Sequence, residues 1–172
     1  MRSAASALAF VFASVIASLL LGAVFHGLST PLAVAGLGLG IFAGAVAWRT
    51  TPEEKRAPLG LWDLLVLGVF VLVSLRAFLW VVFYRGDEIC VLSPNNLGDM
   101  SLHFNFIRNF ASGVPFWPEN PILSGAPLTY PLGADLFNSL LEICGVEIRR
   151  GLVWAGLGGA ALTGFALWRW GG

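Results

Sequence analysis

The chain has 172 residues and no net charge, and 57% of its residues are hydrophobic while only 12% are charged. With a mean hydropathy of +0.80, it has too few polar residues to cover a water-soluble globule, so lipid is expected to cover much of its surface. The neutral charge balance argues against binding to nucleic acid or another polyanion, and two cysteines are too few for a disulfide-built scaffold or a metal ribbon.

Two apolar runs at the start of the chain predict a pair of membrane-spanning helices. Residues 4–25 carry no charge and are long enough to cross a hydrocarbon core of about 30 Å. The apolar part of a secretory signal is shorter, about 7 to 15 residues, so an uncleaved anchor is favoured. In the second run, residues 32–48, the glycines Gly36, Gly40 and Gly44 recur every four residues. This spacing lines one helix face, where missing side chains let another helix approach closely.

The charges of the connecting segments predict which side of the membrane each one faces. Residues 49–61 include Arg49, Lys55 and Arg56, whereas the short connection at residues 26–31 has no Lys or Arg. Because short positively charged loops stay in the cytoplasm, residues 49–61 are expected inside, and the N-terminus with them. The expected location is the inner (plasma) membrane, crossed several times.

Two further apolar runs complete a predicted all-α integral membrane protein with about four transmembrane helices. Residues 64–84 would run outward as the third span, and residues 151–168 would return as the fourth. The long segment between them, residues 85–150, is expected to be extracytoplasmic and to contain amphipathic juxtamembrane helices. We therefore expect two parts, an N-terminal hairpin with its cytoplasmic loop (1–61) and a second part (62–172) with both later spans.

Arg76 is the one charge well inside a predicted span, about eight residues from its outer end. A charge at that depth is costly and invites a functional explanation. Its side chain could snorkel to the interface or pair with an acid. Alternatively, its guanidinium could face a cavity and hold an anionic headgroup such as a lipid phosphate. The sequence leaves both interpretations open.

The outer loop begins with a predicted amphipathic helix over residues 99–112. Projected at about 100° per residue, its polar face comprises Ser101, Asn105, Arg108, Asn109 and Ser112. Most of the remainder is a broad apolar stripe, made of Met100, Leu102, Phe104, Phe106, Ile107 and Phe110. Asp99 and His103, one turn apart, point into the apolar part. On a partly desolvated surface, an acid and an imidazole can acquire the shifted proton affinities that general acid–base catalysis requires. The alternative is that Asp99 only caps the helix and that His103 is an interfacial residue.

The loop has few residues that could hold a metal or form a cross-link. A divalent metal at Asp99 and His103 would need further ligands, and nothing in the sequence fixes Asp87 or Glu88 near them. No cofactor is predicted, and a divalent metal is left as the less favoured alternative. Cys90 and Cys144 stand near opposite ends of the loop. They could form a disulfide in an oxidising compartment or remain free thiols.

The rest of the loop predicts an irregular segment followed by a second short helix. Residues 113–131 contain five prolines, so neither a helix nor a central strand can persist there. Trp117 and Tyr130 are suited to anchoring at the headgroup level, and such rings could also stack on a sugar. Residues 132–144 predict an interfacial or re-entrant helix in which Asp135 stands among leucines.

Three segments of the loop together resemble a known family. GDMSLH, SGVPFWPENP and GAPLTYPLGAD occur in this order after a predicted outward span. They resemble the first large loop of the polyprenol-phosphate-dependent membrane glycosyltransferases of the GT-C superfamily, bacterial relatives included. In that loop an acidic residue and a following histidine precede an amphipathic juxtamembrane helix, a G-x-P-x-W-like turn and a P-L-x-Y-P-like element. The resemblance covers roughly residues 64–168, and the initial hairpin lies outside it.

The resemblance implies transfer of a sugar from a polyprenyl-phosphate donor to an acceptor at the outer face of the membrane. Asp99 would then accept or position the proton of the acceptor hydroxyl, and His103 would assist or bind phosphate. Arg76, Arg149 and Arg150 are additional candidates for contact with the donor phosphate, chosen for their charge at the membrane boundary rather than from the family pattern.

The chain has fewer spans than the family generally has. This would make it a fragment, a split enzyme completed by another transmembrane subunit, or an inactive homologue. A rival hypothesis is a non-catalytic membrane subunit or scaffold whose outer loop docks a partner. A transporter is less favoured, because the spans lack the broken polar helices and paired charges of a transport pathway.

Overall fold

The computed structural model describes residues 1–53, 59–92 and 97–171. Within these ranges the chain is mostly helical, as predicted, and four helices are long and apolar enough to cross a membrane. They are α1 (Arg2–Val24), α2 (Thr30–Thr50), α3 (Leu61–Leu79) and α6 (Ile148–Gly171). The basic residues Lys55 and Arg56, on which the predicted orientation partly depends, lie outside the described residues.

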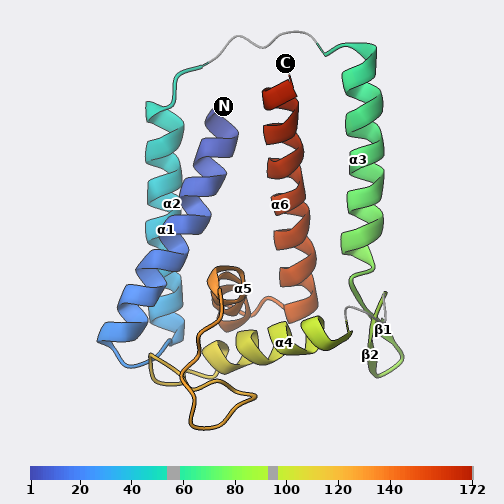
Figure 1. Ribbon diagram of the computed structural model, residues 1–172. Helices are drawn as coiled ribbons and strands as arrows, with labels where there is room; N and C mark the ends of the chain where they lie inside the picture. The colour runs from blue at the N-terminus through green and yellow to red at the C-terminus, as the bar shows by residue number, and fades with distance from the viewer. Residues whose placement is uncertain (54–58, 93–96, 172) are drawn as a thin grey trace.

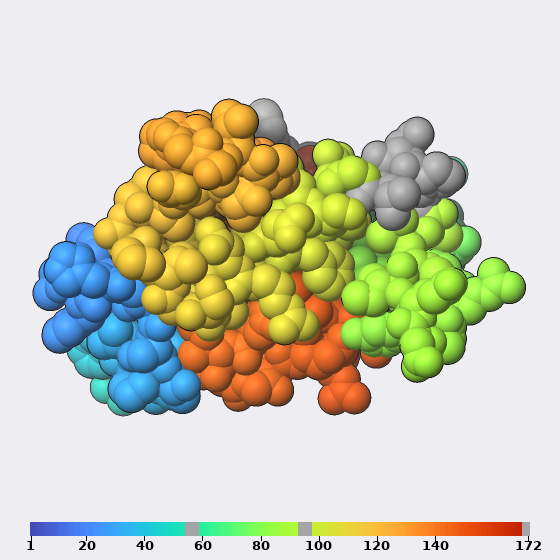
Figure 2. Space-filling model, turned by 90° about the horizontal axis from the view of Figure 1, so that it is seen from below, coloured from blue at the N-terminus to red at the C-terminus, as the bar shows by residue number. Residues whose placement is uncertain are grey.

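The four long helices form two pairs, α1 with α2 and α3 with α6, and both chain termini lie at the same end (Figure 1). At the other end, two short helices, α4 (Leu97–Ala111) and α5 (Gly133–Ile143), lie crosswise to the long ones. We call this the loop end. Seen from it, the segment between α4 and α5 stands over α4, with the α1–α2 turn on one side and the segment after α3 on the other (Figure 2).

The α1–α2 hairpin packs through its small residues, as the glycine spacing predicted. Gly36, Gly40 and Gly44 are buried in α2, and a Cβ atom on any of them would meet α1 at close range. The hydroxyl of Ser6 also donates a 2.8 Å hydrogen bond to the carbonyl oxygen of Gly44. Missing side chains on one helix and small side chains on the other thus bring the two backbones together. The facing residues are Gly36 with Ser18, Gly40 with Ser14, and Gly44 with Ser6.

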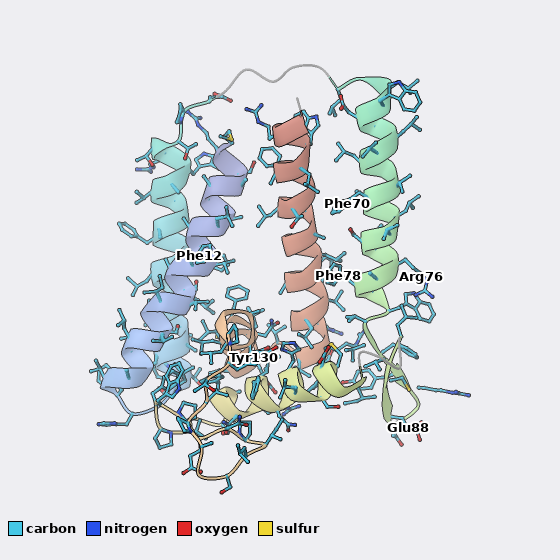
Figure 3. The ribbon with its side chains drawn as sticks, in the orientation of Figure 1. Phe12, Phe70, Arg76, Phe78, Glu88 and Tyr130 are labelled. Carbon is cyan, nitrogen blue, oxygen red and sulfur yellow. The ribbon has the colours of Figure 1, made fainter. Side chains whose placement is uncertain are left out.

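The second pair of helices packs through aromatic side chains set against glycines. Phe70 and Phe78 project from α3 toward α6 (Figure 3). Their rings occupy the space that a Cβ atom would take at Gly164 and Gly156, respectively. The spacing of eight residues in both helices keeps each set on one face, because eight residues make slightly more than two turns.

The third helix ends five residues earlier than the predicted span of 64–84, and the chain continues as a β-hairpin. Strand β1 (Val82–Arg85) pairs antiparallel with β2 (Glu88–Val91), and Arg85 lies opposite Glu88. Gly86 begins the two-residue turn with a φ of 63°, which a residue with a side chain rarely adopts. The apolar run VVFY fits a short strand as well as the end of a span, which is why the sequence did not separate the two.

The two short helices of the outer loop form where the sequence predicts them, α4 within one or two residues of 99–112 and α5 within 132–144. They enclose the hydrophobic core of the loop end together with residues from the α1–α2 turn and the proline-rich segment. The core consists of Leu28, Ala33, Phe106, Phe110, Leu128, Leu132, Leu136 and Leu140.

Candidate functional site

Helix α4 has the two faces that its sequence predicts. Of the predicted polar residues, Ser101, Asn105, Arg108 and Ser112 are exposed and Asn109 is half-buried. On the opposite side Phe106, Ile107 and Phe110 are fully buried, and this part of the stripe packs against α5. This part of the apolar stripe of α4 is therefore buried inside the protein and not left for the membrane.

His103 makes its polar contact with α5 and not with Asp99. Its Nδ1 atom lies 2.8 Å from Oδ1 of Asp135. The side chain of Asp135 is only 3% exposed, whereas that of His103 is 31% exposed. The pair thus consists of a buried carboxyl and an imidazole that still reaches the surface, two side chains that stand 32 positions apart in the sequence.

Burial dominates the electrostatics of Asp135. It raises the pKa of the carboxyl above its usual range, while the hydrogen bond from His103 and the charge on that ring act in the opposite direction. The second oxygen, Oδ2, is buried and has no hydrogen-bond partner among the described residues. An ionised Asp135 therefore depends on His103 for its stabilisation.

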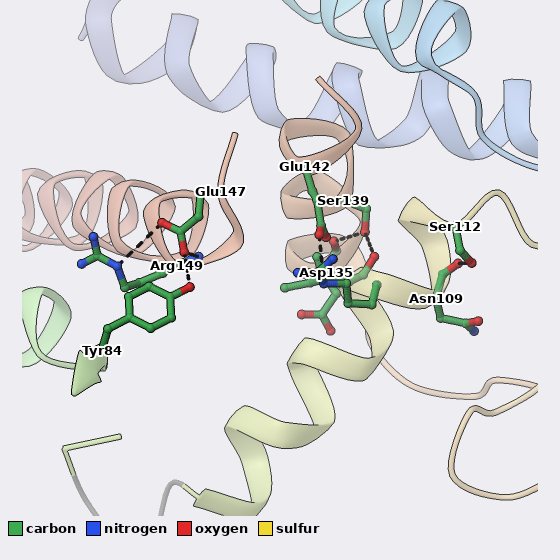
Figure 4. A network of polar contacts seen from close by, with 10 residues as sticks. Tyr84, Asn109, Ser112, Asp135, Ser139, Glu142, Glu147 and Arg149 are labelled. Carbon is green, nitrogen blue, oxygen red and sulfur yellow. Dashed lines mark hydrogen bonds and ion pairs between the residues drawn. The ribbon is translucent and has the colours of Figure 1, made fainter. Parts of the chain in front are cut away.

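Other contacts join α4 to α5 around this pair (Figure 4). The hydroxyl of Ser139 donates a 3.0 Å hydrogen bond to the carbonyl oxygen of Ile107. One turn further along, Nε of Arg108 lies 3.0 Å from Oε1 of Glu142. The three contacts run along the length of α5, so the two helices are held in register by polar bonds as well as by the core.

The aromatic residues predicted to anchor or bind substrate lie close to the same site. The ring of Tyr130 packs edge-on against His103, with 6.0 Å between centroids, and lies 5.0 Å from the ring of Phe106. Trp117 has its ring partly exposed, and its Nε1 donates a 2.6 Å hydrogen bond to the carbonyl oxygen of Leu128. Tyr130 is thus a wall of the His103 site, whereas the polar atom of Trp117 is used within the loop.

Asp99 lies in the first turn of α4 and is exposed. It makes no hydrogen bond or ion pair with any described residue, His103 included. No described element covers Asp99, so a partly desolvated surface around it would have to come from the membrane. The physical reason is that α5 covers α4 only from about His103 onward, so the first turn has no neighbouring helix to bury it.

The three arginines proposed to contact phosphate lie in two different places. Because α3 ends at Leu79, Arg76 is only three residues from the helix end and not deep in a span. Its guanidinium lies over the ring of Trp80, 5.2 Å from the centroid, and points away from the other helices (Figure 3). This geometry agrees with snorkelling toward the interface. Arg149 and Arg150 instead lie at the start of α6.

The start of α6 holds a second polar cluster, centred on Glu147. Its Oε1 accepts hydrogen bonds from the hydroxyl of Tyr84 at 2.8 Å and from the backbone N–H of Arg149 at 3.1 Å. Nε of Arg149 lies 3.7 Å and Nε of Arg150 3.9 Å from Oε2. The guanidinium of Arg149 also lies 5.6 Å from the ring of Tyr84 (Figure 4).

These contacts shift both titrating groups of the cluster. Burial acts to raise the pKa of Glu147, but the hydrogen bonds from Tyr84 and from the backbone, together with the charge of Arg149, outweigh it and lower that pKa. The hydrogen bond to Glu147, with some burial, raises the pKa of Tyr84. The cluster ties the β-hairpin to α6, so the charge of Arg149 is largely used inside the protein, whereas most of the Arg150 side chain is exposed.

An apolar groove of about 880 Å³ lies between α1, α5 and α6, within the range of about 300–1,000 Å³ that is common for ligand pockets. Among the described residues, no charged side chain lines it. The lining is made of small, aromatic and aliphatic residues with few polar ones, and includes Ala7, Phe10, Phe137, Trp154, Gly158 and Gly159. Since α1 and α6 are candidate membrane spans, the groove would open to lipid.

Neither a metal cluster nor a disulfide is present in the part of the chain that the structure describes. No group of three or more His, Cys, Asp or Glu side chains comes together there. Cys90 and Cys144 are free thiols. The carboxylates Asp87 and Glu88 lie at the turn of the β-hairpin.

No protein-family model, curated protein or solved structure matches the chain. The resemblance to GT-C glycosyltransferases therefore stays a prediction from the loop motifs. The functional candidate that the sequence interpretation missed is Asp135. Its signals in the sequence are its place at the end of GAPLTYPLGAD and its position among leucines in a short amphipathic helix.

Proposed function

We propose that the chain is a membrane glycosyltransferase of the GT-C type, or a segment or subunit of one, that transfers a sugar from a polyprenyl-phosphate donor at the outer face of the membrane. One observation carries this proposal. Helix α4, which bears Asp99 and His103, lies crosswise at the ends of candidate spans α3 and α6. A catalytic helix in this position would meet the headgroup of a lipid-linked donor at the membrane boundary.

The proposal assigns the chemistry to the loop end. Asp99, exposed in the first turn of α4, accepts the proton of the acceptor hydroxyl, whose oxygen attacks the anomeric carbon of the sugar. The bond between that carbon and the phosphate oxygen breaks, and the phosphate leaves with the electron pair. His103 lies one turn away on the same helix and faces the phosphate. The apolar groove beside α5 offers room for part of a lipid chain.

The rival function is a non-catalytic membrane subunit whose loop end docks a partner. Two observations favour it. The described residues give Asp99 no polar neighbour that would orient or activate it, and the pairs His103–Asp135 and Arg108–Glu142 could serve only to hold α4 on α5. The two functions differ in their dependence on Asp99, because docking of a partner needs no general base.

The test is sugar transfer by the full chain in proteoliposomes. Radiolabelled glucose, mannose and arabinose are each supplied as the polyprenyl-phosphate derivative, and transfer is followed as release of polyprenyl phosphate. We expect Asp99→Asn to lower kcat/KM by about 10² to 10⁴, the usual contribution of a general base. Asp87→Asn is the matched control, because Asp87 is an exposed carboxylate at the same end of the molecule.

Equal rates for wild type, Asp99→Asn and Asp87→Asn would remove Asp99 from the mechanism. No transfer by wild type from any of the three donors, with the chain folded and membrane-inserted, would favour the docking subunit.

A further inference from the structure

We propose that Asp135 is a positioning residue, which holds His103 through Nδ1 and so presents the other ring nitrogen, Nε2, as the hydrogen-bonding and proton-transfer atom for the donor phosphate. The inference rests on the proposed function and adds to it a role for Asp135, the last residue of GAPLTYPLGAD, to which the resemblance assigns none. It starts from the 2.8 Å contact between Nδ1 and Oδ1.

The contact fixes the orientation of the imidazole. A side chain that is 31% exposed would ordinarily sample several ring orientations, but the bond to a buried carboxyl on another helix selects one. Tyr130 closes a second side of the ring. The pair uses Nδ1 inside the protein, and Nε2 has no partner among the described residues. Nε2 is therefore the ring nitrogen that stays available for a ligand.

Uptake of one proton by the pair also decides whether Nε2 accepts or donates a hydrogen bond. When Asp135 is ionised and His103 neutral, Nδ1 carries the hydrogen, and Nε2 is an acceptor. When the pair takes up one more proton, Nε2 carries a hydrogen in either arrangement, as imidazolium beside carboxylate or as neutral imidazole beside carboxylic acid. The pair thus switches Nε2 between acceptor and donor, and the proton belongs to the two residues together.

The donor state suits the leaving group of the proposed reaction. As the bond between the sugar and the phosphate oxygen breaks, that oxygen gains the electron pair, and Nε2–H donates its hydrogen bond or its proton to it. The proton of the acceptor hydroxyl goes to Asp99. Exchange of one proton with water at each residue then restores the starting state. The titratable groups that contact His103 among the described residues are Asp135 from α5 and Tyr130 from the loop, and Asp99 lies one turn away on α4 without contacting it.

A purely structural role explains the geometry less well. The bond between Ser139 and Ile107 and the pair Arg108–Glu142 already join α4 to α5, and the core residues bury the rest of the contact. A buried carboxyl with one oxygen that no described residue bonds adds a desolvation cost that an apolar pair of similar size would avoid.

The direct test observes the ring nitrogens of His103 by ¹⁵N NMR in nanodiscs, with and without polyprenyl monophosphate. We expect a hydrogen-bonded Nδ1 in wild type, and a change at Nε2 when the phosphate lipid is added. In Asp135→Asn the Nδ1 bond and the response at Nε2 are both weakened. The inference would be overturned if the Nε2 signal did not change on addition of polyprenyl monophosphate. It would also be overturned if the Nε2 signal of Asp135→Asn changed as much as that of wild type.

Transfer kinetics provide the second readout. Asp135→Asn is expected to lower kcat by about 10- to 100-fold, by analogy with the loss when the hydrogen-bonding partner of a metal-binding histidine is removed. It should leave KM nearly unchanged and shift the pH–rate profile. Asp135→Glu is expected to restore much of kcat. Ser139→Ala is the matched control, because it removes a buried hydroxyl that lies 3.0 Å from the carbonyl oxygen of Ile107 and 2.7 Å from that of Asp135, while the Asp135 carboxyl and His103 stay in place.

An unchanged pH–rate profile in Asp135→Asn, or the same loss of kcat in Ser139→Ala, would show that Asp135 is only structural. If wild type transfers no sugar while Nε2 still responds to the phosphate lipid through Asp135, the proposed reaction fails and the binding role of the pair stands.

Discussion

The buried carboxyl of Asp135 should make the stability of the protein depend on pH. Because its pKa is raised in the folded state, the folded chain binds this proton more tightly than the unfolded chain, in which the pKa is about 3.9. The contribution to stability is complete below the unfolded value. It is lost as the pH rises through the raised folded value.

We therefore expect the unfolding free energy of wild type to fall relative to that of Asp135→Asn as the pH rises from about 4. Thermal unfolding in detergent at a series of pH values measures the difference. Asp87→Asn serves as control, because this exposed carboxylate should leave the wild-type profile unchanged. Parallel profiles for wild type and Asp135→Asn would contradict the burial of Asp135.

Also at the level of single residues, the sequence could identify His103 but not its partner. Helical periodicity relates Asp99 and His103, because both stand on one short helix. The contact between His103 and Asp135 depends instead on how two helices dock, and periodicity within either helix carries no information on that. The same limit applies to Glu147, whose bond to Tyr84 joins two elements that are distant in the sequence.

Among the elements, the packing of α1 on α2 makes the sharpest prediction. A Cβ atom at Gly36 would collide with Oγ of Ser18, whereas one at Gly38 would meet nothing within 4 Å. Gly36→Ala should therefore cost about 1–3 kcal/mol through overpacking. Gly38→Ala should be neutral or slightly stabilising, because alanine favours the helix by up to about 1 kcal/mol. Steric trapping in bicelles measures both free energies of unfolding.

A double variant checks the physical reason for that difference. Ser18→Ala removes the oxygen that a Cβ at Gly36 would meet, and the next atom is the Cβ of residue 18 at 3.2 Å. The Oγ of Ser18 is buried without a hydrogen-bond partner in the described part of the chain, so its removal should cost little. Gly36→Ala combined with Ser18→Ala should recover most of the lost stability. An equally unstable double variant would exclude the serine as the cause.

The helices themselves were predictable, because each is a long apolar run or a short segment with helical periodicity. The predicted end of the third span, at residue 84, was wrong, because α3 ends at Leu79. There, a strand of β-branched and aromatic residues follows the span without a polar residue between them, and both structures have the same apolar pattern. What distinguishes them is the pairing of β1 with β2, which places the turn at Gly86.

For the whole molecule, the proposed orientation predicts which cysteine a membrane-impermeant maleimide reaches. Cys144 is exposed and lies at the loop end, just after α5. In intact cells that express Cys90→Ser, Cys144 should be labelled from outside. For the opposite end, Glu53→Cys without the two native cysteines should be labelled only after permeabilisation, since the side chain of Glu53 is 83% exposed. The reverse pattern would place the loop end in the cytoplasm.

The pairing of the long helices could be predicted only in part. The glycines of α2 predict a close neighbour, and the short turn after α1 leaves little choice of partner. The association of α3 with α6 has no comparable signal, because Phe70 and Phe78 give no indication of which glycines they will cover. The groove between the two pairs follows from that association and was equally unpredictable.

The core of the loop end contains side chains from both sides of the predicted boundary at residue 61. Leu28 and Ala33, from the first hairpin, pack in the same cluster as Phe106 and Leu136. A Cβ atom at Gly27 would meet the carbonyl oxygen of Gly113, so the hairpin turn lies directly on the segment after α4. The catalytic candidates therefore could not be transplanted into another protein as a self-contained cassette. A chimaeric protein that received residues 62–172 would need α1 and α2 as well. Without them, Phe106 and Leu136 would lose their contacts with Leu28 and Ala33.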